Sequence, residues 1–405
     1  LRTLPAVCAL RESQPKARIT WLVEPRCAGA VELCPAVDEI LTFPRGEIVR
    51  SLRRGRLPSL LASFIQMRAQ LREPRFDCVL DFHGLLKSGL LSRLTGSGFR
   101  VGYESPHARE FSWLFTHHRV ALSKPYCSRF ERNRDLVEAL GMWVEPSGPI
   151  LEIPETARSA MQSALGPEQR PTLLHPGTSE AAAGKRWAPE RFAALANRVK
   201  ETTGRRCLVL SGPLESERVL QRRVVEASQG AAMAAPVTRS LADLAALTSL
   251  AGVFVGADSG PLHLASLLGT PVLQLLGPTD PVHNEPYAGT PWRRAYKPTT
   301  SGPSRRGRPS PPRMDGLGVD HVWQEPQALC REVGEWPGHR SAGEGRGTRL
   351  LPRDTREIPT AAGFVVQRQV EPLLTDDEAG GHVGRVGEGA AERRRLARAG
   401  GDEED

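Results

Sequence analysis

A cluster of polar residues follows an apolar run in the stretch VFVGADSGPLHLASLLGTPVLQLLGPTDP, residues 253–281. Asp258, Ser259 and Gly260 come directly after the run, and His263 lies about one helical turn further on. Two apolar runs around a short helix predict a β-α-β unit. The free N–H groups of a first helical turn bind anions, and a glycine there lets a phosphate approach the backbone. The stretch therefore predicts a phosphate site, with a tight structural turn as the alternative.

A second stretch, LLHPGTSEAAAGKRWAPERF at residues 173–192, joins an apolar run to a helix through a loop of small residues. Thr178 and Lys185 supply a hydroxyl and a cation, which can together hold a pyrophosphate. The spacing is not that of a Walker loop, so ATP hydrolysis is not indicated. A solvated basic loop is the alternative.

A third stretch, LSGPLESERV at residues 210–219, places two carboxylates after a Ser-Gly-Pro turn. Glu215 or Glu217 can accept hydrogen bonds from ribose hydroxyls, and the sequence does not choose between them. The alternative is that both acids only stabilise the first turn of a helix through its dipole.

Two stretches of the first half also carry polar residues, CVLDFHGLLKSGLLSRL (78–94) and RVGYESPHAREFSWLFTHHRV (100–120). Asp81 and Lys87 lie around a predicted strand-to-helix turn, and Arg109 belongs to the same half. The two adjacent histidines of the second stretch would point apart on a strand, so no metal site is expected. A half-exposed basic face is the alternative.

The elements that must position these residues are alternating strands and helices, which predict parallel, doubly wound α/β sheets. A proline-rich stretch, 144–157, predicts a boundary between an N-terminal domain, 1–150, and a C-terminal domain, 151–333. The expected strands are 18–24, 78–82, 100–103, 172–175, 206–211, 252–255 and 272–275, and the clearest expected helices are 188–203, 214–228 and 319–333.

Composition narrows the class of protein. Hydrophobic residues make up 40% of the 405 residues, yet no stretch approaches the roughly 18 consecutive apolar residues of a membrane span. The seven cysteines are scattered without a C-x-x-C pair, which indicates buried, reduced thiols and no zinc site.

The net charge is +8, but residues 331–405 hold 12 arginines and 15 acids, so residues 1–330 carry +11. Such a surface favours an anionic partner. No nucleic-acid-binding signature accompanies it, so nucleic acid is not the expected partner. The segment 50–76 is basic and partly amphipathic, which favours contact with an anionic membrane face; an ordinary surface helix is the alternative.

Residues 334–405 have a different composition from the rest. They contain 13 of the 39 glycines and show no regular period. This pattern predicts a low-complexity, disordered tail. Removal of residues 340–405 is therefore expected to leave the fold intact.

Four stretches together resemble glycosyltransferase family 9, the lipopolysaccharide heptosyltransferases. They are GADSGPLHLASLLGTPVLQLLGPTDP, HPGTSEAAAGKRWAPERFAALA, DFHGLLKSGLLSRL and RVGYESPHARE. The resemblance covers roughly residues 1–333, and its first-half stretches are most similar to heptosyltransferase I.

The resemblance implies a GT-B fold, with two Rossmann-like domains facing a cleft. It implies transfer of heptose from ADP-heptose to the Kdo-lipid A inner core, with inversion and without a metal or other cofactor. The implied location is the cytoplasm of a Gram-negative bacterium, in peripheral contact with the inner face of the inner membrane. Acceptor contacts fall on Lys87 and Arg109. Donor contacts fall on Thr178, Lys185, Glu215 or Glu217, Asp258, Ser259, Gly260 and His263.

The chain departs from the family pattern at its first residues, LRTLPAVCAL. The resemblance places a first strand and a Gly-Asp loop before Leu1, and the Asp of that loop is the family's proposed catalytic base. We therefore expect the first sheet to lack a central strand. Two alternatives stay open: a non-catalytic remnant that binds a nucleotide sugar, and a GT-B enzyme that uses another nucleotide sugar.

Overall fold

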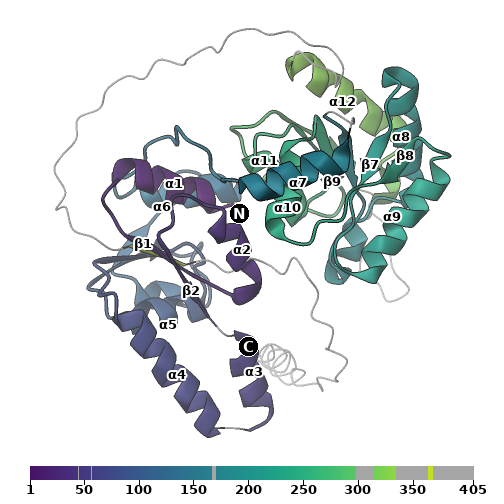
Figure 1. The fold of residues 1–405 in the computed structure, drawn as a ribbon. Coiled ribbons are helices and arrows are strands. Elements are labelled where there is room, and N and C mark those ends of the chain that lie inside the picture. The colour runs from purple at the N-terminus through teal and green to yellow at the C-terminus, as the bar shows by residue number, and fades with distance from the viewer. Residues whose placement is uncertain (44, 56, 167–169, 298–313, 334–363, 368–405) are drawn as a thin grey trace, which may run out of the picture. The chain divides into compact units, whose positions relative to one another are not determined.

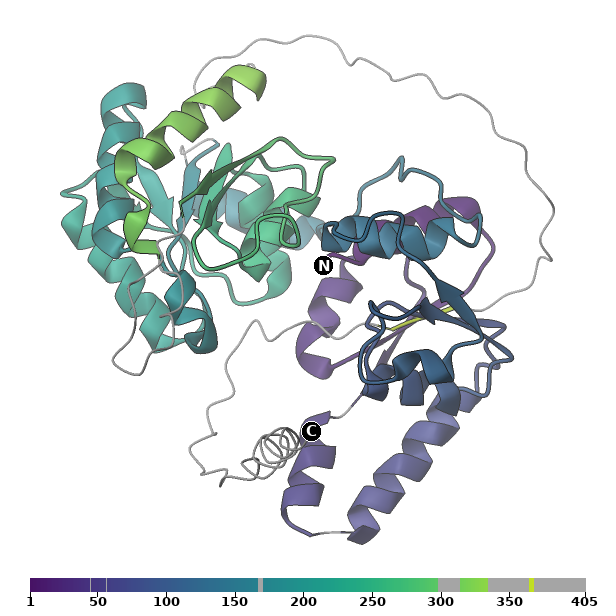
Figure 2. The ribbon, with the colours of Figure 1, turned by 180° about the vertical axis from the view of Figure 1, so that it is seen from behind.

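The computed structural model describes residues 1–43, 45–55, 57–166, 170–297, 314–333 and 364–367, all within one compact unit, Leu1–Leu373. The strands form two separate six-stranded sheets, and helices pack against them (Figure 1; Figure 2). All strand pairs in both sheets are parallel, which confirms the expected α/β class.

The first sheet has the order β2-β1-β12-β3-β4-β5. Its strands are β1 (Ile19–Val23), β2 (Glu39–Thr42), β3 (Cys78–Asp81), β4 (Phe99–Tyr103), β5 (His118–Val120) and β12 (Phe364–Gln367). Its helices are α1 (Leu4–Ser13), α2 (Ala28–Glu32), α3 (Arg45–Arg53), α4 (Leu57–Arg72), α5 (Leu86–Leu94) and α6 (Arg129–Glu138), with short 3₁₀ turns at Pro25–Cys27 and Ser112–Phe115.

The second sheet has the order β11-β10-β9-β6-β7-β8. Its strands are β6 (Thr172–His175), β7 (Cys207–Val209), β8 (Ala232–Ala234), β9 (Val253–Ala257), β10 (Val272–Leu276) and β11 (Trp292–Tyr296). Its helices are α7 (Glu155–Leu165), α8 (Pro189–Thr203), α9 (Glu215–Ala227), α10 (Leu241–Ser249), α11 (Gly260–Leu267) and α12 (Val319–Val333), with 3₁₀ turns η3 (Glu180–Lys185) and η4 (Met314–Gly316).

The strand order of the second sheet reverses direction between β6 and β9. Chain order runs one way from β6 through β7 to β8, and the other way from β9 through β10 to β11. Loops that leave the carboxyl ends of the two strands at such a point diverge, which opens a crevice where ligands bind in doubly wound sheets. The polar stretches after β6 and β9 therefore meet at this edge.

Alternation along the strands explains why helices cover both faces of the second sheet. Val253 and Val255 belong to one apolar cluster, which also contains Phe192 of α8. Phe254, between them, belongs to another cluster together with Met161 of α7. Successive strand residues point to opposite faces, and both faces are apolar here.

A segment from near the C-terminus occupies the centre of the first sheet. Strand β12 pairs with β1 on one side and with β3 on the other. The expectation that the first sheet lacks a central strand is therefore wrong, because β12 occupies that position. The physical reason is that the facing edges of β1 and β3 carry backbone N–H and C=O groups, which an extended segment can pair. Apart from β12, residues 334–405 lie outside the described residues, and the disorder expected of this tail stays a prediction.

All seven expected strands are confirmed, and each end lies within two residues of its expected position. The sequence did not predict the short strands β2, β5, β8, β11 and β12. The division between residues 150 and 151 stays a prediction, because one apolar cluster contains Leu4, Trp21 and Leu136 together with Ala245 and Leu264.

Candidate functional site

An ion pair joins the loops that follow β6 and β9. Asp258 comes directly after β9, and Lys185 is the last residue of η3, in the loop after β6. The Nζ atom of Lys185 lies 3.1 Å from Oδ2 of Asp258. The Asp258 side chain is only 6% exposed, whereas that of Lys185 is 30% exposed. Lys185 therefore presents a cation at the sheet edge while it neutralises a buried carboxylate.

Arg2 supplies a second cation to the same carboxylate. Its guanidinium lies 2.9 Å from Oδ1 of Asp258, and both side chains are less than 10% exposed. The backbone at Arg2 is fixed by the buried Asn133 of α6, whose amide donates to the Arg2 carbonyl at 2.9 Å. A charge from the segment just before α1 is thus built into the Asp258 site.

His263 of α11 completes this group. Its Nε2 contacts Oδ1 of Asp258 at 3.0 Å and also contacts the guanidinium of Arg2. Nε2 can donate to the carboxylate or accept from the guanidinium, but one neutral nitrogen cannot do both. Nδ1 is buried and has no hydrogen-bond partner among the described residues.

The charges of the group are set by burial and by the two cations. Burial pushes the pKa of Asp258 upward, but the hydrogen bond with His263 and the charges of Arg2 and Lys185 outweigh it, so this pKa lies well below its usual range. Burial lowers the pKa of His263 to about 3, assisted by the charge of Arg2. At neutral pH the site therefore contains an ionised Asp258 and an uncharged imidazole.

The first turn of α11 lies beside this group. Ser259 is the N-cap residue, but its side chain makes no capping hydrogen bond, and its buried Oγ has no partner among the described residues. Pro261 has no N–H to offer, so the amides around Gly260 remain as donors. The first-turn amides, a hydroxyl without a partner among the described residues and Lys185 together make a suitable anion site.

Thr178 organises the loop after β6. Its hydroxyl donates to the carbonyl of Ala182 at 3.0 Å and accepts from Nε of Arg186 at 3.1 Å. Arg186 also donates to the Thr178 carbonyl at 2.7 Å. These bonds hold the small-residue loop that ends at Lys185, so Thr178 positions the cation.

The structure separates the two candidate acids. Glu215 is 64% exposed and pairs with Arg218 and Arg222. Glu217 is buried, and burial raises its pKa. Its Oε2 has no hydrogen-bond partner among the described residues. Glu217 therefore holds a carboxylate with unused acceptor capacity inside the site, and Glu215 does not.

Two glycines make room for the Glu217 carboxylate. A Cβ atom at Gly212, just after β7, would lie 2.0 Å from Oε2. A Cβ atom at Gly177, just after β6, would lie 2.8 Å from Oε1. Because β9, β6 and β7 are neighbours about 4.8 Å apart, Glu217 and the Lys185–Asp258 pair occupy successive positions along one sheet edge.

The polar residues of the first half gather around the end of β3. Asp81 is buried and accepts from the backbone N–H groups of His83 and Gly84 and from the hydroxyl of Ser88. These three hydrogen bonds fix the turn after β3, so Asp81 has a structural role. The backbone N–H of Arg109 donates to Gly84 at 2.9 Å.

The two expected acceptor-binding cations differ in exposure. Lys87 is half-buried in the first turn of α5, whereas the side chain of Arg109 is exposed. The structure thus brings both residues to the same turn region, after β3.

Sequence reasoning missed Arg2 and His175. No local pattern marks Arg2, because its partner Asp258 is 256 residues away. His175 ends β6, and burial lowers its pKa to about 4. Its position at the end of an apolar run, directly before Pro176-Gly177, is the signal in the sequence that could have identified it.

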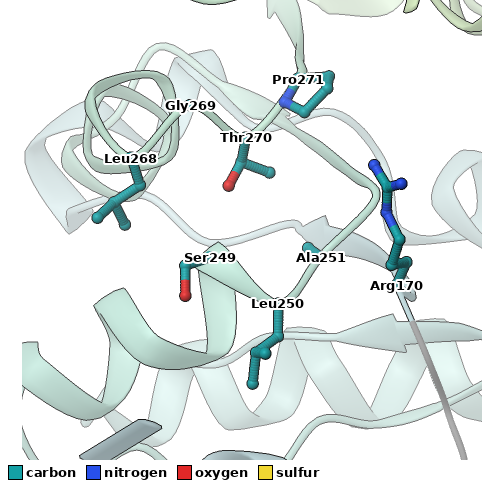
Figure 3. A pocket seen from close by; sticks show the side chains of 8 residues that line it. All are labelled: Arg170, Ser249, Leu250, Ala251, Leu268, Gly269, Thr270 and Pro271. Carbon is teal, nitrogen blue, oxygen red and sulfur yellow. The ribbon is translucent and has the colours of Figure 1, made fainter. Parts of the chain in front are cut away.

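Two cavities lie away from these residues. One, of about 300 Å³, is lined by Arg170 and by residues just before β9 and β10, at the amino-terminal edge of the second sheet (Figure 3). The other, of about 610 Å³, lies between α7 and the segment after β8.

Within the described residues, no group of three or more His, Cys, Asp or Glu side chains is placed to hold a metal. No helix among these residues has the length and apolarity to cross a bilayer.

Comparison with known proteins shows which family the chain resembles. Residues 64–293 match the family described as glycosyltransferase family 9 (heptosyltransferase). The chain is 23% identical to the lipopolysaccharide core heptosyltransferase OpsX of Haemophilus influenzae, over 70% of this chain and 77% of that one. It is 26% identical to lipopolysaccharide heptosyltransferase 1 of Escherichia coli, over 69% of this chain and 85% of that one.

Two solved structures have a similar fold. The E. coli heptosyltransferase WaaC with ADP superposes with a TM-score of 0.63 at 23% identity, covering 81% of this chain and 95% of that one. A glycosyltransferase family 9 protein from Veillonella parvula gives a TM-score of 0.64 at 20% identity, covering 82% and 93%. At these identities the similarity shows the fold.

Proposed function

The chain belongs to glycosyltransferase family 9 and has the GT-B fold of its heptosyltransferases, and from this premise we propose which reaction it catalyses. The proposed reaction is transfer of heptose from ADP-heptose to the Kdo-lipid A inner core of lipopolysaccharide, with inversion and without a required metal. The proposed location is the cytoplasmic side of a Gram-negative inner membrane.

The observation that carries the proposal is the Lys185–Asp258 pair beside the first turn of α11, at the switch point of the second sheet. Cleavage of a sugar–phosphate bond develops negative charge on the departing diphosphate. A fixed cation and oriented amide dipoles stabilise that charge more strongly in the transition state than in the free donor. Lys185 and the amides around Gly260 fill this role, so the chain's own groups can neutralise the leaving ADP.

Glu217 extends the same site toward the nucleoside. Its buried carboxylate follows β7, next to the strands that carry Lys185 and Asp258, where we propose that the diphosphate binds. Its Oε2 is an unused acceptor among the described residues. We assign it to the ribose hydroxyls of ADP, because an ionised acceptor strengthens hydrogen bonds from hydroxyl donors. Asp258 and the uncharged His263 would then face the donor sugar. Lys87 and Arg109 are proposed to contact the acidic acceptor sugars.

A transfer assay tests the proposal. Purified protein is mixed with Kdo-lipid A and either ADP-heptose or a UDP-hexose, and the lipid product is identified by mass. We expect a heptose adduct only with ADP-heptose. Transfer from the UDP-sugar instead would replace the donor in the proposal. Binding of ADP without transfer from any donor would favour a protein that only binds nucleotide sugars.

A further inference from the structure

Helix α4 leaves one apolar face uncovered by the described residues. The apolar stripe, as we call it, consists of Leu57, Leu61, Phe64 and Ile65. Their exposures are 71%, 60%, 45% and 59%. Positions i, i+4, i+7 and i+8 lie on one side of a helix, so these side chains form one continuous strip.

The same helix is firmly anchored at its other end. Met67 and Leu71 are buried in an apolar cluster that includes Phe76 and Val79 of β3, so this end of the helix packs against the first sheet. The stripe therefore belongs to a helix that is held at its C-terminal end, and it continues outward from that anchor. Helix α3 packs beside α4, joined through a turn at Gly55, so the two form a helical hairpin (Figure 1).

The hairpin is strongly basic. Residues 45–72 contain seven arginines and one acid, Glu47. Among the described side chains, the exposed arginines of the hairpin are Arg50, Arg53, Arg54, Arg68 and Arg72. An apolar strip bordered by arginines matches a surface with acyl chains under anionic headgroups.

The charge also argues against a second copy of the chain as the occupant. A two-fold interface would bring the same arginine-rich patch against itself. Repulsion between arginines at close range opposes such a dimer, whereas an anionic bilayer neutralises the arginines.

We propose that the α3–α4 hairpin is the membrane-docking element of this protein, with the apolar stripe inserted among the lipids and the arginines on anionic headgroups. This inference rests on the proposed function in one respect, since a lipid acceptor requires the enzyme to work at a membrane. Beyond the proposed function, it specifies which element docks, which residues insert and which class of lipid they meet.

Vesicle sedimentation tests the proposal with the full chain and without donor or acceptor. The vesicles contain phosphatidylcholine alone, or phosphatidylcholine with one quarter phosphatidylglycerol. The stripe variant is Leu61→Ser with Ile65→Ser. Its matched control is Leu114→Ser with Val237→Ser, which removes exposed apolar side chains elsewhere, 66% and 77% exposed. The charge variant is Arg53→Gln with Arg54→Gln, and its control is Arg218→Gln with Arg222→Gln on α9.

We expect the unaltered chain to bind the anionic vesicles much more tightly than the neutral ones. The stripe variant should bind anionic vesicles at least about ten-fold more weakly, because two inserted side chains are lost. The charge variant should lose about thirty-fold in low salt, as expected for two arginines near an anionic surface. Both controls should bind as the unaltered chain does, and hydrogen exchange of residues 57–66 should slow on anionic vesicles.

Equal vesicle binding by the stripe variant and its control would overturn the proposal. So would a concentration-dependent dimer, formed without lipid and lost in the stripe variant. ADP binding, measured in parallel, keeps this test separate from the proposed function: failure there with intact vesicle binding would reject the donor and leave the docking element standing.

Discussion

At the scale of single residues, Glu217 and Glu215 form a natural matched pair. They stand two positions apart on α9, yet one is buried against Gly177 and Gly212 and the other is 64% exposed. Glu217→Gln should weaken ADP binding about ten-fold or more, because a hydrogen bond to a charged acceptor is replaced by a neutral one. Calorimetric titration with ADP measures this.

Glu215→Gln is the control and should leave ADP affinity unchanged. The free energy of unfolding should not fall in Glu217→Gln, since burial already disfavours that charge. Equal affinities of the two variants for ADP would remove Glu217 from the nucleoside site.

Lys185 carries the second prediction at this scale. Lys185→Ala removes the cation that we propose to face the diphosphate, while Asp258 keeps Arg2 as a partner. We expect kcat/KM for the donor to fall about 100-fold, the size seen when one charge-stabilising group is lost. Steady-state kinetics with ADP-heptose measures it. Lys200→Ala is the control, because that exposed amine donates to the Gly230 carbonyl, away from Asp258. Similar losses of kcat/KM in both variants would contradict the assignment.

Single residues also show which parts of the candidate site the sequence predicts and which it does not. Asp258 and Lys185 could be predicted, because each follows a buried strand in a polar stretch that breaks the apolar pattern. The choice between Glu215 and Glu217 could not, because it depends on glycines after two other strands. Arg2 could not either, since nothing near position 2 indicates a carboxylate 256 residues away.

At the scale of elements, β12 makes the most specific prediction. The chain ending at residue 340 lacks this strand, and the chain ending at residue 373 keeps it. We expect the shorter chain to melt more than about 5 °C below the longer one, because β1 and β3 would lose their shared partner. Calorimetry of both chains measures this, with hydrogen exchange of β1 and β3 as a local readout.

This outcome would reverse the expectation drawn from composition, that residues 340–405 can be removed without cost to the fold. Equal melting temperatures of the two chains would instead restore that expectation. Composition did not predict β12 for a local reason: Phe-Val-Val-Gln is a strand-forming segment of four residues among glycine and arginine, too short to shift the average. Strands β2, β5 and β8, of three or four residues, escaped detection for the same reason.

At the scale of the whole molecule, the doubly wound order of the second sheet explains why distant stretches share one site. The carboxyl ends of β9, β6 and β7 are neighbours in space although β9 is some 45 residues beyond β7 in sequence. The alternation of strands and helices predicted the class of fold. The order of strands within each sheet needed the structure, because pairing is set by helix packing on both faces and not by any single segment.

Buried histidine gives the whole molecule a pH-dependent stability. Burial lowers the pKa of His175 to about 4, while an unfolded histidine titrates near 6.5. Between these values the unfolded chain binds a proton that the folded chain does not, so the free energy of unfolding falls as pH drops through this window. The loss from this one group is on the order of 3 kcal/mol across the window. His263, with a pKa of about 3, acts in the same direction.

Denaturant unfolding at pH 7, 6, 5 and 4 measures how steeply the free energy of unfolding depends on pH. His175→Gln removes one titrating group and should make the slope shallower between pH 6.5 and 4; an unchanged slope would mean that His175 is protonated in the folded protein.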